Sequence, residues 1–141
     1  MLKIKSHSPD ETEDIAKRFA KKLYGTEIIA LYGDLGAGKT CFVRGLCCGL
    51  GMDDNVSSPT FAIINEYNGI FNVYHFDMYR ITSEEDLYST GFFDYINDGI
   101  IVTEWSENIE EFLPQGTIKV HIGYGKNENE RELTFEGINE L

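Results

Sequence analysis

The stretch Gly33-Asp34-Leu35-Gly36-Ala37-Gly38-Lys39-Thr40 matches the pattern G-x-x-x-x-G-K-[ST] in full. It lies between a short apolar run at residues 28–32, which predicts a buried strand, and a predicted helix at about 39–50. Gly33 permits a tight exit from the strand, and Gly36 and Gly38 let the backbone approach a phosphate because no Cβ stands in the way. Successive N–H groups then form an anion-binding nest at the helix N-terminus. The motif therefore predicts a loop that binds the phosphates of a nucleotide.

Two side chains of this loop indicate a nucleoside triphosphate bound with magnesium. Lys39 supplies a positive charge for the β- and γ-phosphates, and the Thr40 hydroxyl is a typical magnesium ligand. GTPases usually recognise guanine through an N-K-x-D loop, which this sequence lacks. ATP is therefore the expected nucleotide, and GTP is the alternative.

Length and charge narrow the class of protein further. The 141 residues fit one domain over residues 1–141. The net charge is −12, with 24 acidic and 12 scattered basic residues, so we expect any nucleic acid to be contacted mainly by a partner. No apolar run approaches the ~18 residues of a membrane helix, and the N-terminus lacks the apolar core of a signal peptide. These features predict a cytoplasmic protein without a membrane segment.

The remaining patterns predict an α/β fold. A capping box at residues 8–11 opens a helix that Gly25 can end, and a second capping box at 82–85 opens a short helix. Asn68-Gly69 predicts a two-residue hairpin turn within residues 61–76. A strand is expected at 100–102, a short helix at 108–113, and a final strand pair around 118–122 and 133–135. The expected fold is a P-loop NTPase-like mixed sheet flanked by helices, with a parallel core and antiparallel hairpin additions.

Two carboxylates are placed where the chemistry of a phosphate loop needs them. Asp77 follows the apolar strand 72–76, and Glu104 ends the run 99–103. Parallel strands deliver side chains at their carboxyl ends to a ligand crevice, where one acid positions magnesium and another group orients the attacking water. The residues alone leave open which carboxylate takes which role. Arg80 is a candidate for neutralising charge on the γ-phosphate, and a surface salt bridge is its alternative.

The segment Ser58-Pro59-Thr60 follows the predicted P-loop helix, where switch segments of other P-loop proteins sense the γ-phosphate. Its alternative is a proline turn that leads into the hairpin. The sequence therefore predicts either a nucleotide-sensing loop or an ordinary connection at these three residues.

The order GDLGAGKT, SPTF, HFDMYR and TEWSE resembles the TsaE (YjeE) family over about residues 8–114. The resemblance implies a bacterial ATPase required for making threonylcarbamoyladenosine in tRNA. It also implies that magnesium is held by Thr40 and Glu104, and that hydrolysis is supported by Asp77 with Arg80 close by. A switch-like loop would contain Ser58, Pro59 and Thr60. The implied ATP site comprises Gly33, Gly36, Ala37, Gly38, Lys39, Thr40, Cys41, Phe42 and Asp77.

The resemblance extends less specifically to two further residues and to partner proteins. Thr12 and Arg131 would touch the nucleotide by similarity. Cys41 stands where the family usually has Thr, so a side-chain hydroxyl is lost while a backbone N–H remains for the α-phosphate. The implied partners are TsaB and TsaD, and tRNA would be reached only through that complex.

Two other functions fit a phosphate loop of this kind. A small-molecule kinase needs a substrate pocket and usually several arginines, whereas only Arg44 and Arg80 lie near the motifs here. A nucleotide-dependent binding switch without meaningful turnover is the second alternative.

Overall fold

The computed structural model describes residues 1–34, 36–52 and 64–141. Ser58, Pro59 and Thr60 lie outside the described residues. The strands are β1 (Leu2–Ser6), β2 (Ile28–Tyr32), β3 (Ile64–Tyr67), β4 (Val73–Asp77), β5 (Ile100–Glu104), β6 (Ile118–Tyr124) and β7 (Arg131–Glu136). The helices are α1 (Pro9–Ala20), α2 (Lys39–Gly49), α3 (Glu84–Ser89), α4 (Phe92–Tyr95) and the 3₁₀ helix η1 (Ser106–Phe112).

One mixed sheet carries the fold, with the strand order β1-β7-β6-β2-β5-β4-β3. The central strands β6, β2, β5 and β4 run parallel to one another. β3 pairs antiparallel with β4, and β7 pairs antiparallel with both β6 and β1. The parallel core with antiparallel additions that the sequence predicts is thereby confirmed.

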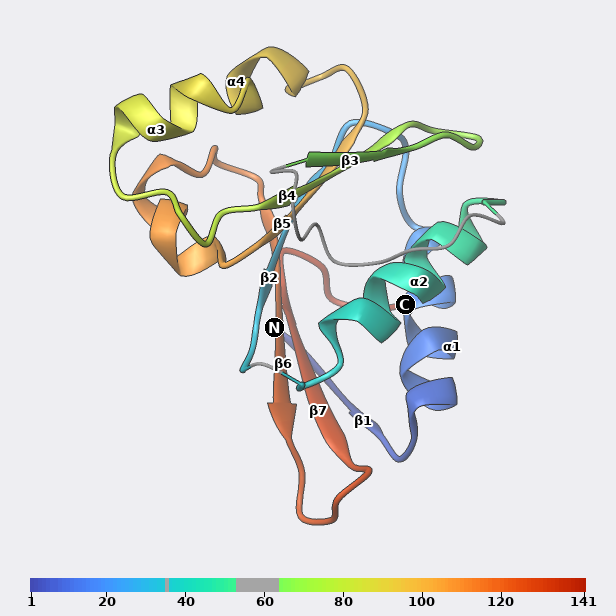
Figure 1. The fold of residues 1–141 in the computed structure, drawn as a ribbon. Coiled ribbons are helices and arrows are strands. Elements are labelled where there is room, and N and C mark those ends of the chain that lie inside the picture. Colours follow the sequence, from blue (N-terminus) through green and yellow to red (C-terminus); the bar gives the residue numbers. More distant parts are fainter. Residues whose placement is uncertain (35, 53–63) are drawn as a thin grey trace.

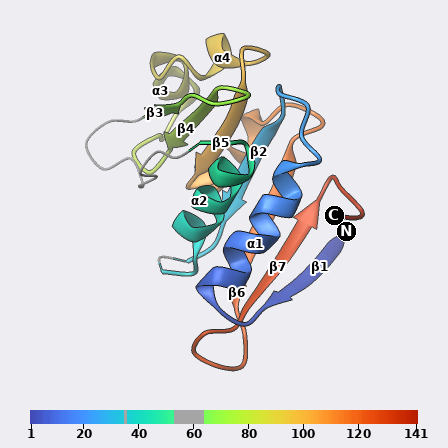
Figure 2. The ribbon, with the colours of Figure 1, turned by 90° about the vertical axis from the view of Figure 1, so that its right-hand side faces the viewer.

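The two faces of the sheet bury separate apolar clusters because side chains alternate along each strand. Ile29 and Leu31 of β2 pack in one cluster with α1 and α2, whereas Ile28 packs in the other with Leu87 of α3 and Phe92 of α4. Figure 1 shows α1 and α2 together on one side of the sheet and α3 and α4 on the other, and Figure 2 looks onto the α1–α2 side. Within the described residues, every helix is too short or too polar to span a lipid bilayer.

Helix α1 begins as predicted and ends earlier than predicted. The Ser8 hydroxyl accepts a hydrogen bond from the Glu11 backbone N–H at 3.1 Å, and Pro9 is the first helical residue. Gly25 was expected to end this helix, but α1 ends at Ala20, and tighter turns follow through Leu23. Gly25, at φ +119°, instead lies in the turn that leads into β2, where a Cβ would lie 2.8 Å from the Phe71 ring.

The predicted two-residue turn at Asn68-Gly69 is wrong. β3 ends at Tyr67 and β4 begins at Val73, so the connection runs over residues 68–72. A tight type I′ turn needs positive φ at both central residues, and neither Asn68 nor Gly69 has it. Gly69 packs against Met52 instead, so that a Cβ added there would lie 2.6 Å from Met52 Cγ. This contact with the segment that follows α2 stands in place of the tight hairpin turn.

Four elements differ from the sequence prediction. The N-cap of α3 is Ser83, which accepts from the Asp86 N–H at 3.1 Å, while Thr82 donates to the Asp86 carboxylate. The short helix predicted at 108–113 is the 3₁₀ helix η1, which starts earlier, at Ser106. β1 and α4 were not predicted, although Leu2 and Ile4 alternate with lysines.

Candidate functional site

The glycines of the phosphate loop hold backbone conformations that other residues rarely adopt. Gly33, Gly36 and Gly38 have φ values of +152°, +82° and +109°. At Gly33 a Cβ would lie 2.6 Å from the carbonyl oxygen of Ile122, so this position is also closed to a side chain by β6. At Gly36 a Cβ would lie 3.4 Å from the Tyr124 hydroxyl. The loop therefore requires glycine for its backbone shape and for its close contact with β6.

Helix α2 begins directly after the phosphate loop, and its N-terminus has no capping side chain. Gly38 is the N-cap residue and makes no side-chain hydrogen bond, and no acidic residue lies in the first turn. The first N–H groups of a helix carry a partial positive charge and lack partners within the helix. This end of α2 therefore suits an anion such as a phosphate group.

The Lys39 side chain folds back over the loop. Its Nζ donates a hydrogen bond to the Gly33 carbonyl at 2.8 Å and lies 5.5 Å from the centre of the Trp105 ring. Lys39 is only 8% exposed, which is unusual for lysine unless its charge is partnered. Because Trp105 directly follows β5, this contact brings the end of β5 beside the phosphate loop.

A pocket of about 120 Å³ adjoins the loop, and Gly36, Gly38 and Cys41 form part of its wall. The other wall contains Thr12 of α1 and Arg131 of β7, the two residues whose link to the site was the least specific. The Thr12 hydroxyl hydrogen-bonds to Ser6 Oγ at 2.6 Å. The structure therefore places both distant residues against the phosphate loop.

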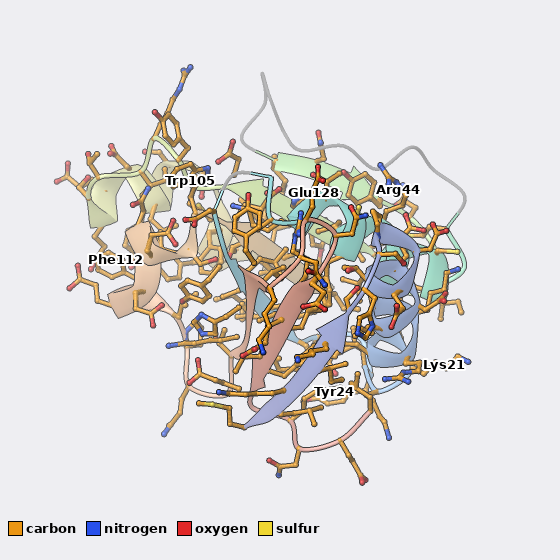
Figure 3. All side chains as sticks on the ribbon, turned by 90° about the horizontal axis from the view of Figure 1, so that it is seen from below. Lys21, Tyr24, Arg44, Trp105, Phe112 and Glu128 are labelled. Atoms are coloured by element: carbon orange, nitrogen blue, oxygen red, sulfur yellow. The ribbon has the colours of Figure 1, made fainter. Side chains whose placement is uncertain are left out.

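Arg131 contacts the backbone of the loop directly. Its Nε donates to the Ala37 carbonyl at 3.0 Å, its Nη1 donates to the carbonyls of Glu128 and Glu130 at 2.7 and 2.8 Å, and its guanidinium lies 4.7 Å from the centre of the Tyr124 ring. Figure 3 views the molecule from the end that carries the phosphate loop. Glu128, whose carbonyl accepts from Arg131, lies there between Trp105 and Arg44. The β6–β7 hairpin is thus fastened to the phosphate loop through one arginine.

Phe42 differs from the other predicted nucleotide contacts. Its side chain is fully buried and packs against Phe19 and Phe135 in the core beneath α2. Phe42 can therefore offer a ligand only its backbone N–H, and that group already donates to the Gly38 carbonyl at 3.0 Å.

The two predicted carboxylates end adjacent parallel strands at the same register position. Asp77 of β4 pairs with Glu104 of β5. Glu104 is 6% exposed, and its Oε2 lies 2.6 Å from Nε2 of the fully buried His75. Asp77 is half-buried, and its Oδ1 accepts from the Tyr79 N–H at 2.9 Å. The two carboxylates therefore share one edge of the sheet but differ in solvation.

Aromatic and basic side chains border this edge. Trp105 adopts the left-handed conformation at φ +57°, and its ring meets the exposed Tyr79 ring edge-on at 4.8 Å. Arg80 is exposed at this edge. Trp105 and Tyr124 were not predicted as site residues, although Trp105 directly follows the acid at the end of a strand in TEW.

The donor set fits a divalent cation that shares its ligands with phosphate groups. Glu104, Asp77 and the Thr40 hydroxyl offer hard oxygen atoms of the kind that magnesium prefers. Among the described residues no group of three or more His, Cys, Asp or Glu side chains is arranged to hold a metal ion alone. Magnesium is usually bound by one or two carboxylates together with substrate phosphates and waters, and Asp77 and Glu104 are paired at the strand ends.

Comparison with known proteins finds a family model and several relatives that match most of this chain. Residues 6–133 match the family model described as "Threonylcarbamoyl adenosine biosynthesis protein TsaE". A tRNA threonylcarbamoyladenosine biosynthesis protein TsaE of Bacillus subtilis is 43% identical over 97% of this chain and 86% of its own length. The protein of that name from Haemophilus influenzae is 40% identical over 94% of this chain and 90% of its own length. A crystal structure of Bacillus subtilis YdiB superposes with a TM-score of 0.73 at 39% identity, covering 95% of this chain and 83% of that one.

Proposed function

Because this chain belongs to the TsaE family, we propose that it is a magnesium-dependent ATP hydrolase that serves threonylcarbamoyladenosine modification of tRNA. In this proposal its ATP hydrolysis drives turnover of a complex of TsaB and TsaD, and TsaD transfers the threonylcarbamoyl group. One observation supports the proposal above all others. A phosphate loop with a partnered, buried Lys39 adjoins a sheet edge at which Asp77 and Glu104 stand side by side.

Nucleotide binding is assigned to the loop and the start of α2. The backbone around Gly36 and Gly38 accommodates phosphate oxygens, and Lys39 exchanges its bond with the Gly33 carbonyl for one with the β- and γ-phosphates. Arg131 keeps the loop in this shape through the Ala37 carbonyl. Thr12 and Cys41 border the remainder of the nucleotide. The absence of an N-K-x-D loop from the sequence supports ATP over GTP.

Hydrolysis is assigned to the carboxylate edge. Thr40 and Glu104 would hold magnesium, which supplies charge neutralisation at the transferred phosphoryl group. Asp77, the more solvated carboxylate, would orient the attacking water. The exposed Arg80, three residues after the end of β4, would neutralise the developing charge. Ser58, Pro59 and Thr60 remain proposed as a switch-like loop.

The surface of the chain supports action through a protein partner. With a net charge of −12, the chain is poorly suited to neutralise the phosphates of tRNA itself. The Tyr79 and Trp105 side chains are 59% and 36% exposed, and Trp105 stacks above the phosphate-loop lysine. Aromatic side chains of this kind are enriched at protein interfaces. A partner seated on them would contact the nucleotide site directly.

ATP hydrolysis by the purified chain, measured with and without magnesium, tests the enzymatic part. We expect slow hydrolysis that requires magnesium and is abolished in Lys39→Ala, while circular dichroism stays unchanged. Lys21→Ala, at an exposed lysine after α1, is the matched control and should hydrolyse like the parent chain. Wild-type-like hydrolysis by Lys39→Ala would contradict the assignment of the site.

A further inference from the structure

A chain of buried polar side chains leads from the rim of the sheet to Glu104. The Tyr67 hydroxyl lies 3.3 Å from His75 Nδ1, and His75 Nε2 lies 2.6 Å from Glu104 Oε2. His75 is fully buried, Tyr67 is 6% exposed and Glu104 is 6% exposed. The three residues belong to three adjacent strands, β3, β4 and β5.

The strand register explains why these side chains meet. His75 is opposite Val102 of β5, and Asp77 is opposite Glu104, so His75 and Glu104 are diagonal neighbours on one face of a parallel pair. Val73 and Val102 lie on that same face and pack in the cluster beneath α2. The imidazole therefore fills the space under the Glu104 carboxylate, on the side of the sheet that carries the phosphate loop.

Both ring nitrogens of His75 have partners. Nε2 faces the Glu104 carboxylate, and Nδ1 faces the Tyr67 hydroxyl. Among the described residues no buried side-chain nitrogen or oxygen lacks a hydrogen-bond partner. A fully satisfied buried network holds its members in one arrangement. One oxygen of Glu104 is thereby held by a buried ring that is itself hydrogen-bonded on both sides.

We propose that His75 is a positioning residue that holds the Glu104 carboxylate for magnesium binding, with Tyr67 holding His75 in turn. This inference rests on the proposed assignment of Glu104 as a magnesium ligand. Partners behind a metal-binding carboxylate orient it, and their loss typically weakens metal binding 10- to 100-fold. His75 therefore acts on magnesium through Glu104 and not by touching nucleotide or water.

Two substitutions of His75 by amide side chains distinguish a positioning role from simple packing in the core. His75→Asn places its amide near the position of Nδ1 and does not reach Glu104, whereas His75→Gln places an N–H donor near the position of Nε2. Both replace the ring by a buried amide, so their costs in stability should be alike. His121→Asn is the matched control, because His121 Nε2 makes the same 2.6 Å contact with Glu136 Oε2, on β6 and β7.

The readout is ADP binding by calorimetry, with and without magnesium, together with the midpoint of thermal unfolding. We expect His75→Asn to lower the affinity gain from magnesium about tenfold, with metal-free ADP affinity unchanged. His75→Gln should restore most of that gain, and His121→Asn should leave it intact. Equal weakening of ADP binding with and without magnesium, or equal values for the two amides, would overturn the positioning role.

Glu104→Gln separates the positioning role of His75 from the assignment of Glu104 as a magnesium ligand, on which that role rests. A loss of magnesium dependence in Glu104→Gln but not in His75→Asn overturns positioning alone. An unchanged magnesium dependence in Glu104→Gln overturns the metal assignment itself, and positioning with it. If neither amide at residue 75 folds, Tyr67→Phe takes their place, because it removes only the hydroxyl. Positioning then predicts a partial loss of the magnesium effect, and no loss contradicts it.

Discussion

Asp77 and Glu104 occupy paired register positions at the ends of the parallel strands β4 and β5, yet their environments differ. Glu104 is nearly buried and bonded to His75, whereas Asp77 is half-buried and accepts only a backbone hydrogen bond among the contacts described for it. A fixed carboxylate suits a metal ligand, and a more solvated one suits a group that orients water. The structure thereby favours a division of roles that the residues alone left open.

The first prediction tests this division. Glu104→Gln should reduce magnesium-dependent ATP binding on the order of 10- to 100-fold. Asp77→Asn should bind ATP nearly normally but hydrolyse it at least about 100-fold more slowly, because an amide is a poor acceptor for the proton of water. Binding by calorimetry and single-turnover hydrolysis give the two quantities. The reverse pattern would mean that the two roles are exchanged.

The second prediction concerns the backbone of the phosphate loop. Gly38→Ala forces a left-handed conformation on alanine at about 1–2 kcal/mol, and an added Cβ would meet nothing within 4 Å. Gly116→Ala is the matched control, since Gly116 has φ +91° and the same open space. Thermal unfolding should show similar losses of stability. Only Gly38→Ala should also weaken ATP binding, and equal nucleotide affinities would argue against the loop as the site.

The third prediction concerns Arg131. Arg131→Lys keeps the charge but cannot donate to three backbone carbonyls while stacking on Tyr124, so the loop loses its fastening to β7. We expect ATP affinity to fall about tenfold, which corresponds to about 1.4 kcal/mol. The control is Arg44→Lys, because the contact that Arg44 makes within the described residues is an exposed pair with Glu13 at 3.2 Å. Equal affinities in the two variants would contradict the fastening.

Sequence reasoning located the phosphate loop, the strand before it and the helix after it because each has a strong local pattern. It also placed Asp77 and Glu104 at strand ends, since an apolar run followed by an acid is visible in the chain. The bond between His75 and Glu104 was not predictable, because it depends on the register between strands 29 residues apart in sequence. The predicted two-residue turn at Asn68-Gly69 was wrong for a similar reason, since the contact between Gly69 and Met52 overrides the local turn preference.

The fourth prediction concerns stability at alkaline pH. The pKa of Tyr74 is raised above its ordinary value of 10.0 by its hydrogen bond to Asp98, at 2.6 Å, and by burial. Because the folded pKa exceeds the unfolded one, this contribution is fully present below about pH 10 and is lost as pH rises further. Tyr74→Phe should therefore lose stability at neutral pH and show a flatter decline above pH 10. Parallel alkaline melting curves for the two proteins would contradict this.

The proposal that ATP hydrolysis by this chain drives repeated tRNA modification by TsaB and TsaD can be measured in one reconstitution. The quantity is the amount of modified nucleoside formed per TsaD with purified TsaB, TsaD, threonylcarbamoyl-adenylate, tRNA, ATP and magnesium. We predict many turnovers with this chain, and product that does not exceed the amount of TsaD when the chain is omitted or carries Lys39→Ala. Equal multiple turnover with and without the chain would contradict the account.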